Sequence, residues 1–209
     1  MDQIKIEKLC KKIKDREILK NINVTFDYGT IYGLVGRNGS GKTMLFRALS
    51  GLIRPTSGKI FVKGKELYQE ISIIEKLGIV IENAGLYPEF TGFENLKFLA
   101  GVNEWVGDLE IKNAIERVGL DPDDKRTVKK YSLGMKQRIL IAQAIMEKPE
   151  VLLLDEPTNA LDESGVDLVR DIIKEEASRG ALVIIASHNK EDISLLCDVI
   201  YSLNVGELR

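Results

Sequence analysis

One short segment constrains this chain more than any other, the run Gly36-Arg37-Asn38-Gly39-Ser40-Gly41-Lys42-Thr43. It matches G-x-x-x-x-G-K-[ST], the pattern of a phosphate-binding P-loop. The apolar residues 31–35 before it predict a buried strand, and residues 44–49 after it predict a helix. Glycines let backbone N–H groups turn inward around an anion, and the helix N-terminus adds its positive dipole end. The run therefore predicts a nucleotide site, with Lys42 at the β- and γ-phosphates and the Thr43 hydroxyl on Mg²⁺.

The composition narrows the class of protein. The chain has 209 residues, 44% of them hydrophobic, which suits one large domain or two small ones. A net charge of −2 gives no electrostatic argument for nucleic acid, which usually needs a basic domain or stripe, so we expect no nucleic-acid partner. The N-terminus lacks the apolar core of a signal peptide, and no apolar run approaches the roughly 18 residues of a membrane span. Cys10 and Cys197 match no metal-binding spacing, and we expect reduced, partly buried thiols in a cytosolic protein.

The order of predicted elements indicates an α/β domain. Hydrophobic patterns predict strands in the first third, at residues 3–9, 18–26, 31–35, 58–64 and 77–81. The middle is helical, and its three helices are predicted to be capped by Thr91, Asp108 and Ser132. The last third alternates strands with helices, which is typical of a parallel, doubly wound sheet; these lie at 151–154, 164–178, 181–186, 190–196 and 199–203. We therefore expect one domain over residues 1–209, with a helical subdomain inserted at about 84–148.

Polar side chains follow two of the predicted strands directly. Asp155 and Glu156 come after the apolar run 151–154, and His188, the only histidine, comes shortly after the run 181–186. In P-loop NTPases a strand of the first kind supplies an Asp that helps to hold Mg²⁺. We predict that role for Asp155, and for Glu156 the orientation and polarisation of the attacking water. His188 is expected at the same edge of the sheet, where it can donate a hydrogen bond to the γ-phosphate.

A further motif adds a specific resemblance to one protein family. The run 131–138, Tyr-Ser-Leu-Gly-Met-Lys-Gln-Arg, resembles the signature motif of ATP-binding cassette (ABC) ATPases, and residues 159–162 resemble the loop after their Walker B strand. Order and spacing of the motifs agree over essentially the whole chain. As a helix cap beside Gly134, Ser132 can build a second anion site. The resemblance implies that Ser132 and Gly134 face the P-loop of a partner subunit, so that a head-to-tail dimer encloses two ATP molecules.

The same resemblance implies the architecture. It predicts a P-loop NTPase with a RecA-like parallel sheet core, an N-terminal antiparallel β-subdomain and an inserted helical subdomain. It also implies a nucleotide-binding subunit that hydrolyses ATP, with Mg²⁺, to drive a separate integral membrane permease. We expect a homodimer, or a heterodimer with a related cassette, at the cytoplasmic face of the cell membrane. Two alternatives stay open: a soluble cassette ATPase that remodels protein or nucleic acid, and a regulatory cassette that senses ATP.

The chain departs from the family pattern at several positions. Ile13 stands where the family often has an aromatic residue that stacks on adenine, so apolar contact remains without π-stacking. Glu82 replaces a Gln that touches the metal and the attacking water; it is still an oxygen ligand but adds charge. Leu133 and Met135 replace the usual Gly and Gln of the signature. Together with residues 81–83 and 85–88, these variants resemble the bacterial subfamily associated with export of peptide antibiotics such as bacitracin and lantibiotics.

Overall fold

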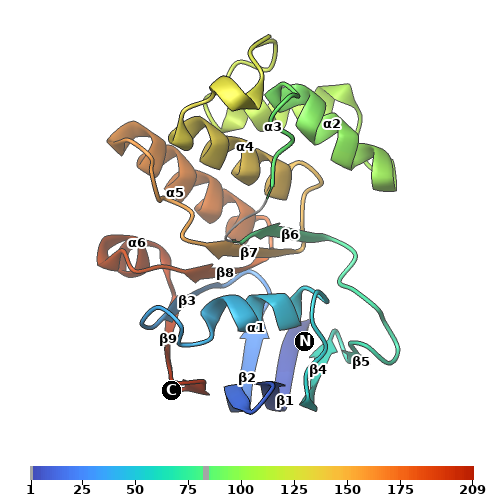
Figure 1. The fold of residues 1–209 in the computed structure, drawn as a ribbon, viewed down its shortest axis with the longest axis vertical. Helices are drawn as coiled ribbons and strands as arrows, with labels where there is room; N and C mark the ends of the chain where they lie inside the picture. The colour runs from blue at the N-terminus through green and yellow to red at the C-terminus, as the bar shows by residue number, and fades with distance from the viewer. Residues whose placement is uncertain (1, 82–84) are drawn as a thin grey trace.

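A computed structural model describes residues 2–81 and 85–209, which form two sheets and a set of covering helices (Figure 1). The six-stranded sheet has the order β10-β9-β3-β8-β7-β6. Its strands are β3 (Ile31–Val35), β6 (Leu77–Val80), β7 (Val151–Asp155), β8 (Leu182–Ala186), β9 (Val199–Asn204) and β10 (Glu207–Leu208). The pairs β9–β3, β3–β8, β8–β7 and β7–β6 are parallel, and β10 is antiparallel to β9. The expected parallel core is therefore confirmed.

The second sheet is antiparallel and has the order β2-β1-β4-β5. Its strands are β1 (Gln3–Ile13), β2 (Arg16–Asp27), β4 (Ser57–Val62) and β5 (Lys65–Glu66). Helix α1 (Lys42–Leu49) lies between this sheet and the six-stranded one in Figure 1. One buried cluster joins all three, and Phe46 of α1 packs in it with Ile6 of β1 and Leu153 of β7. The P-loop is thus fixed at its start by a buried strand and at its end by a buried helix.

The chain between β6 and β7 contains the helices α2 (Gly92–Asn103), α3 (Asp108–Arg117) and α4 (Leu133–Ile145) and the 3₁₀ helix η1 (Val128–Lys130). In Figure 1 these helices cover the side of the six-stranded sheet opposite α1. Helices α5 (Glu163–Ser178) and α6 (Lys190–Leu196) flank β8 in the chain. Successive residues of β7 point to opposite faces of the sheet, and each face packs in its own buried cluster. Leu152 and Leu154 pack in the cluster with α4 and α5. Val151 and Leu153 pack in the cluster with α1.

Most predicted elements are confirmed with small shifts at their ends, and two strands were missed. β5 and β10 have two residues each, too few for a period-two pattern. The cap predicted at Asp108 is wrong. Gly107 is the N-cap of α3, and its N–H donates to Oε2 of Glu110, so that Asp108 is already the first helical residue and pairs with Lys97. The cap at Thr91 is confirmed as a capping box with Glu94.

Two predictions from composition can also be checked. Cys10 and Cys197 are free thiols of intermediate exposure, as expected. Within residues 2–81 and 85–209, no helix is both long enough and apolar enough to cross a membrane.

Candidate nucleotide-binding and catalytic site

The P-loop joins β3 to α1 in a conformation that requires glycine at two positions. A Cβ atom on Gly36 would lie 2.2 Å from the carbonyl oxygen of Leu203 and 2.7 Å from Oγ of Ser40. Gly41 is the N-cap of α1 and has φ +115°, in the region that L side chains avoid. The described residues supply no side-chain cap to this helix. Its first N–H groups are therefore available to an anion, as a phosphate site requires.

The loop borders a pocket of about 440 Å³. This pocket brings together most of the predicted site, and its described lining is Arg16, Ile18, Asn38, Gly39, Gly41, Lys42, Thr43, Met44, Asp155, Glu156 and His188. The volume falls within the range of small-ligand sites. Residues separated by more than a hundred positions thus meet at the carboxyl ends of β3, β7 and β8, as the parallel topology predicts.

Lys42 is largely buried, and its ammonium group contacts both the P-loop backbone and His188. Its Nζ donates to the carbonyl oxygen of Gly36 at 2.7 Å and lies 3.4 Å from Nε2 of His188. A P-loop lysine in this place can approach phosphate oxygens from the side of the loop.

Thr43 and Asp155 provide adjacent oxygen atoms. The Thr43 hydroxyl donates to Oδ2 of Asp155 at 2.7 Å, and Asp155 is only 7% exposed. Oxygen donors of this kind suit Mg²⁺. Among the described residues there is no group of three or more Asp, Glu, His or Cys side chains that could hold a metal. Mg²⁺ at this pair would accordingly complete its coordination with water and phosphate oxygens, as is usual for this ion.

Glu156 and His188 lie against each other. The Glu156 carboxylate accepts from the backbone N–H of His188 at 3.1 Å and from the Ser187 hydroxyl at 3.3 Å. Nε2 of His188 lies 2.7 Å from Oδ1 of Asn38 in the P-loop. In the tautomer with the proton on Nε2, this nitrogen donates to the Asn38 amide oxygen and its N–H is directed at the phosphate loop. The geometry therefore supports the catalytic constellation that the strand ends predicted.

The second predicted anion site lies elsewhere. Ser132 caps α4, with its Oγ accepting from the N–H of Met135 at 3.1 Å. The backbone of Gly134 packs against the loop after β7, since a Cβ there would lie 2.8 Å from the carbonyl oxygen of Ala160. Both residues lie outside the described lining of the P-loop pocket.

The comparisons with known proteins identify the family. A family model described as ABC transporter matches residues 19–159, which is more than half of the chain. The chain belongs to the ABC transporter family. It is an ATP-binding, ATP-hydrolysing cassette of that family, and its fold is the ABC ATPase fold that the motifs predicted.

Relatives along the whole chain agree. The chain is 54% identical to an uncharacterized ABC transporter ATP-binding protein, YybJ of Bacillus subtilis (strain 168), over 98% of this chain and 94% of that protein. It is 38% identical to the bacitracin transport ATP-binding protein BcrA of Enterococcus faecalis, covering 98% of this chain and 67% of the relative. It is 37% identical to the lantibiotic transport ATP-binding protein SrtF of Streptococcus pyogenes, covering 98% of this chain and 88% of the relative. The predicted resemblance to this subfamily is confirmed.

Solved ABC cassettes have the same fold. The dimeric structure of a bacterial ABC transporter cassette matches with a TM-score of 0.89 at 24% identity, covering 99% of this chain and 96% of that one. A dimeric cassette in a post-hydrolysis state with ADP and Pi matches with a TM-score of 0.88 at 23% identity, over 99% and 96%.

Not every predicted site residue of this ABC cassette lies at the pocket. Ile13 is 45% exposed at the end of β1, opposite Arg16 in the hairpin, and it is absent from the described lining. Part of the pocket lining consists of Arg16, Ile18 and Met44. These three residues were not predicted as site residues because none belongs to a motif. Glu82, predicted as a metal ligand, lies outside the described residues.

Two contacts of the ABC signature helix were also missed. The Gln137 side chain donates to the carbonyl oxygens of Glu156 and Pro157, at 3.3 and 3.1 Å. Arg138 forms an ion pair of 2.7 Å with Asp162, the N-cap of α5. Both residues are in the predicted motif, but only the folded chain shows that α4 is tied to the loop that begins with Glu156.

Proposed function

We propose that this ABC ATPase hydrolyses MgATP in a head-to-tail dimer and that the cycle drives a separate integral membrane permease. The observation that carries the proposal is the meeting of Lys42, the Thr43–Asp155 pair and the Glu156–His188 pair around one pocket. A P-loop lysine, a metal-binding pair and a water-orienting carboxylate are the parts that phosphoryl transfer requires.

The roles follow from these positions. The P-loop from Gly36 to Thr43 and the Lys42 ammonium hold the phosphates. Thr43 and Asp155 hold Mg²⁺, which when bound neutralises phosphate charge and orients the γ-phosphate. Glu156 orients the attacking water and takes its proton as the bond to ADP breaks, and His188 donates to the γ-phosphate through Nε2.

The position of Ser132 supports the dimer. Its hydroxyl lies at the N-terminus of α4, outside the pocket of its own chain, and its neighbour Leu133 is 70% exposed. We propose that Ser132 and Gly134 complete the nucleotide site of a partner, which is a second copy or a related cassette. The cassette that matches at a TM-score of 0.89 is itself dimeric.

An exposed aromatic cluster supports a membrane partner. Tyr87, Phe90 and Phe98 are 49%, 36% and 53% exposed, and their ring centroids lie 5.1 to 6.3 Å apart. Grouped exposed rings of this kind indicate a protein contact. We propose that a cytoplasmic segment of the permease covers this cluster, which places the chain at the inner face of the membrane. Within one domain over residues 1–209, the helices from about 84 to 148 then form the inserted subdomain that contacts the permease.

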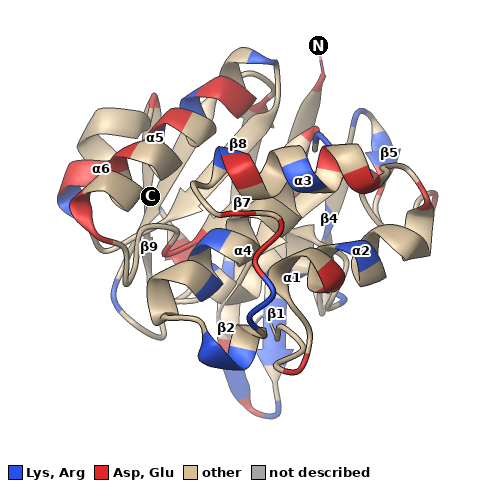
Figure 2. Ribbon diagram, turned by 90° about the horizontal axis from the view of Figure 1, so that it is seen from above, with Lys and Arg blue, Asp and Glu red and all other residues tan. Residues whose placement is uncertain are grey.

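We further propose that the transporter is an exporter of peptide antibiotics, since BcrA is named for bacitracin transport and SrtF for lantibiotic transport. The net charge is −2, and α2, α3, α5 and α6 each carry both acidic and basic residues (Figure 2), which favours this function over nucleic-acid remodelling. Purification with the membrane protein tests the partner. Wild-type chain should co-purify with it, and Phe98→Ala should weaken that association while the ATPase rate of the isolated chain is unchanged. A Phe98→Ala chain that co-purifies as well as wild type would contradict the assigned contact.

A further inference from the structure

A buried ion pair lies just outside the catalytic pocket. Asp192 of α6 is 0% exposed and Arg170 of α5 is 9% exposed. Oδ1 of Asp192 accepts from Nε and Nη2 of Arg170 at 2.8 and 2.7 Å, and Oδ2 accepts from the hydroxyl of Thr158. Burying such a pair costs desolvation energy that its attraction scarcely exceeds, so stability alone does not explain it. All three residues lie outside the described lining of the pocket.

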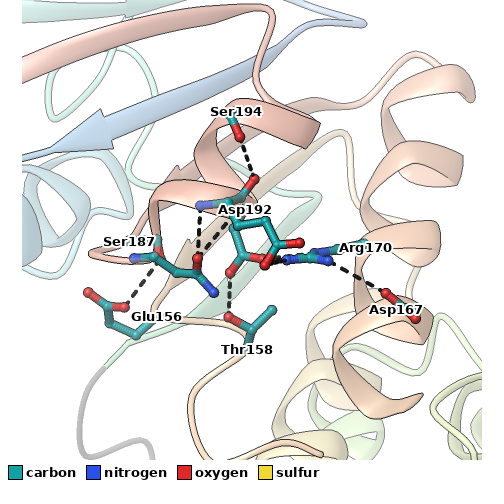
Figure 3. A network of polar contacts seen from close by, with 9 residues as sticks. Glu156, Thr158, Asp167, Arg170, Ser187, Asp192 and Ser194 are labelled. Atoms are coloured by element: carbon teal, nitrogen blue, oxygen red, sulfur yellow. Dashed lines mark hydrogen bonds and ion pairs between the residues drawn. The ribbon is translucent and has the colours of Figure 1, made fainter. Parts of the chain in front are cut away.

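The pair is linked to Glu156 from two sides, through hydrogen bonds on one side and through the chain on the other (Figure 3). From Asp192 the contacts run through its N–H to the side chain of Asn189 at 3.4 Å, and from the N–H of Asn189 to the Ser187 hydroxyl at 3.0 Å. Ser187 in turn donates to Oε2 of Glu156 at 3.3 Å. The other side of the ring is the chain itself, because Thr158 is two residues after Glu156. The loops that follow β7 and β8 are therefore held as one unit.

Glu156 needs such support. Its φ is +50°, in the left-handed region that is strained for a residue with a side chain. Strained conformations persist only where the surroundings fix them. Here the N–H of Glu156 donates to Ala186 at 2.8 Å, and Thr158 is anchored on Asp192 just beyond the turn. Without the second anchor, the chain after Glu156 has one restraint fewer against relaxing to a commoner conformation.

We propose that Asp192, neutralised by Arg170, is a positioning residue for ATP hydrolysis: through Thr158 it holds the turn that directs the Glu156 carboxylate into the pocket. The inference rests on the proposed role of Glu156. It concerns the geometry of that carboxylate. Nucleotide binding depends on the P-loop and is not affected.

Thr158 offers the cleanest test, since Asp192 variants would leave the Arg170 cation buried and are prone to misfold. Thr158→Val keeps the shape and removes the hydroxyl, whereas Thr158→Ser keeps the hydroxyl. We expect kcat to fall about tenfold in Thr158→Val, because small misplacements of a catalytic group are costly. The Kd for ATP should stay within about twofold, and Thr158→Ser should recover most of the rate. Wild-type kcat in Thr158→Val, or equal losses in kcat and ATP affinity, would overturn the proposal.

A double variant shows whether the effect passes through Glu156. In single-turnover assays on the intact chain, Thr158→Val should add no further loss to Glu156→Gln, because the group it positions is already removed. The same tenfold loss in both backgrounds would mean that Thr158 acts elsewhere and would overturn the inference. Glu156→Gln with wild-type turnover would instead refute the proposed role of Glu156. The two failures are therefore distinguishable.

Discussion

The hydroxyl of Thr43 donates a hydrogen bond of 2.7 Å to Oδ2 of Asp155, although 112 positions separate the two residues in the chain. This contact joins the P-loop helix to the end of β7 and sets two oxygen atoms side by side. We expect Asp155→Asn to need more Mg²⁺ for activity, because a neutral amide is a weaker ligand than a carboxylate. The Mg²⁺ concentration at half-maximal ATPase activity should rise about tenfold or more. Removal of Mg²⁺ with a chelator should abolish hydrolysis. Thr43→Ser keeps the hydroxyl and is the matched control; a Mg²⁺ requirement unchanged in Asp155→Asn would remove Asp155 from the metal site.

Glu156 is expected to act in the chemical step alone. Glu156→Gln preserves size and hydrogen bonding but removes the base, so turnover should fall by a factor on the order of 10²–10⁴. Binding of ATP should persist, and the ATP-bound dimer should accumulate because its exit is blocked. Steady-state turnover and size-exclusion chromatography with ATP measure the two effects. Turnover within a few-fold of wild type would exclude Glu156 as the base.

Ile13 tests how the adenine is held. A ring at this position can stack on the base, an interaction worth about 1–3 kcal/mol in nucleic-acid complexes. Ile13→Tyr should therefore bind ATP several-fold more tightly than wild type, and wild type should discriminate little between ATP and GTP. The adjacent Lys12→Tyr is the matched control, because neighbouring side chains of a strand point to opposite faces. Equal Kd values for Ile13→Tyr and wild type would place the adenine against Arg16 and Ile18 instead.

The nucleotide site was largely predictable from sequence because its parts obey local rules. A glycine loop between strand and helix, and carboxylates at the end of an apolar strand, recur with little dependence on the rest of the chain. The rule that parallel strand ends share one edge then placed His188 beside Glu156, as observed.

The features that escaped prediction depend on long-range packing. Asp192 contacts Thr158, 34 positions away in the chain, and Arg170, 22 positions away. No periodic pattern in the sequence predicts these contacts. Arg16 and Ile18 line the pocket from β2, where no motif marks them, and the pairing of β1 with β2 is irregular beside them. The start of α3 was misplaced by one residue because Gly107 caps the helix through its backbone, whereas the sequence offered the acidic side chain of Asp108.

We propose that each ATP site is shared between two subunits, with Lys42 of one and Ser132 of the other. Lys42→Ala destroys the phosphate cradle of its own chain, and Ser132→Arg blocks the site of the partner. Each variant alone should form homodimers without a working site.

Mixing the two inactive variants tests the shared site most directly. In a mixed dimer one site combines both defects, while the other combines native Lys42 with native Ser132. We predict that ATPase activity returns on mixing and falls on dilution as dimers dissociate. A differently tagged copy of each variant would show by pull-down that mixed dimers have formed. Mixed dimers that form with ATP but stay as inactive as the separate variants would contradict the shared site.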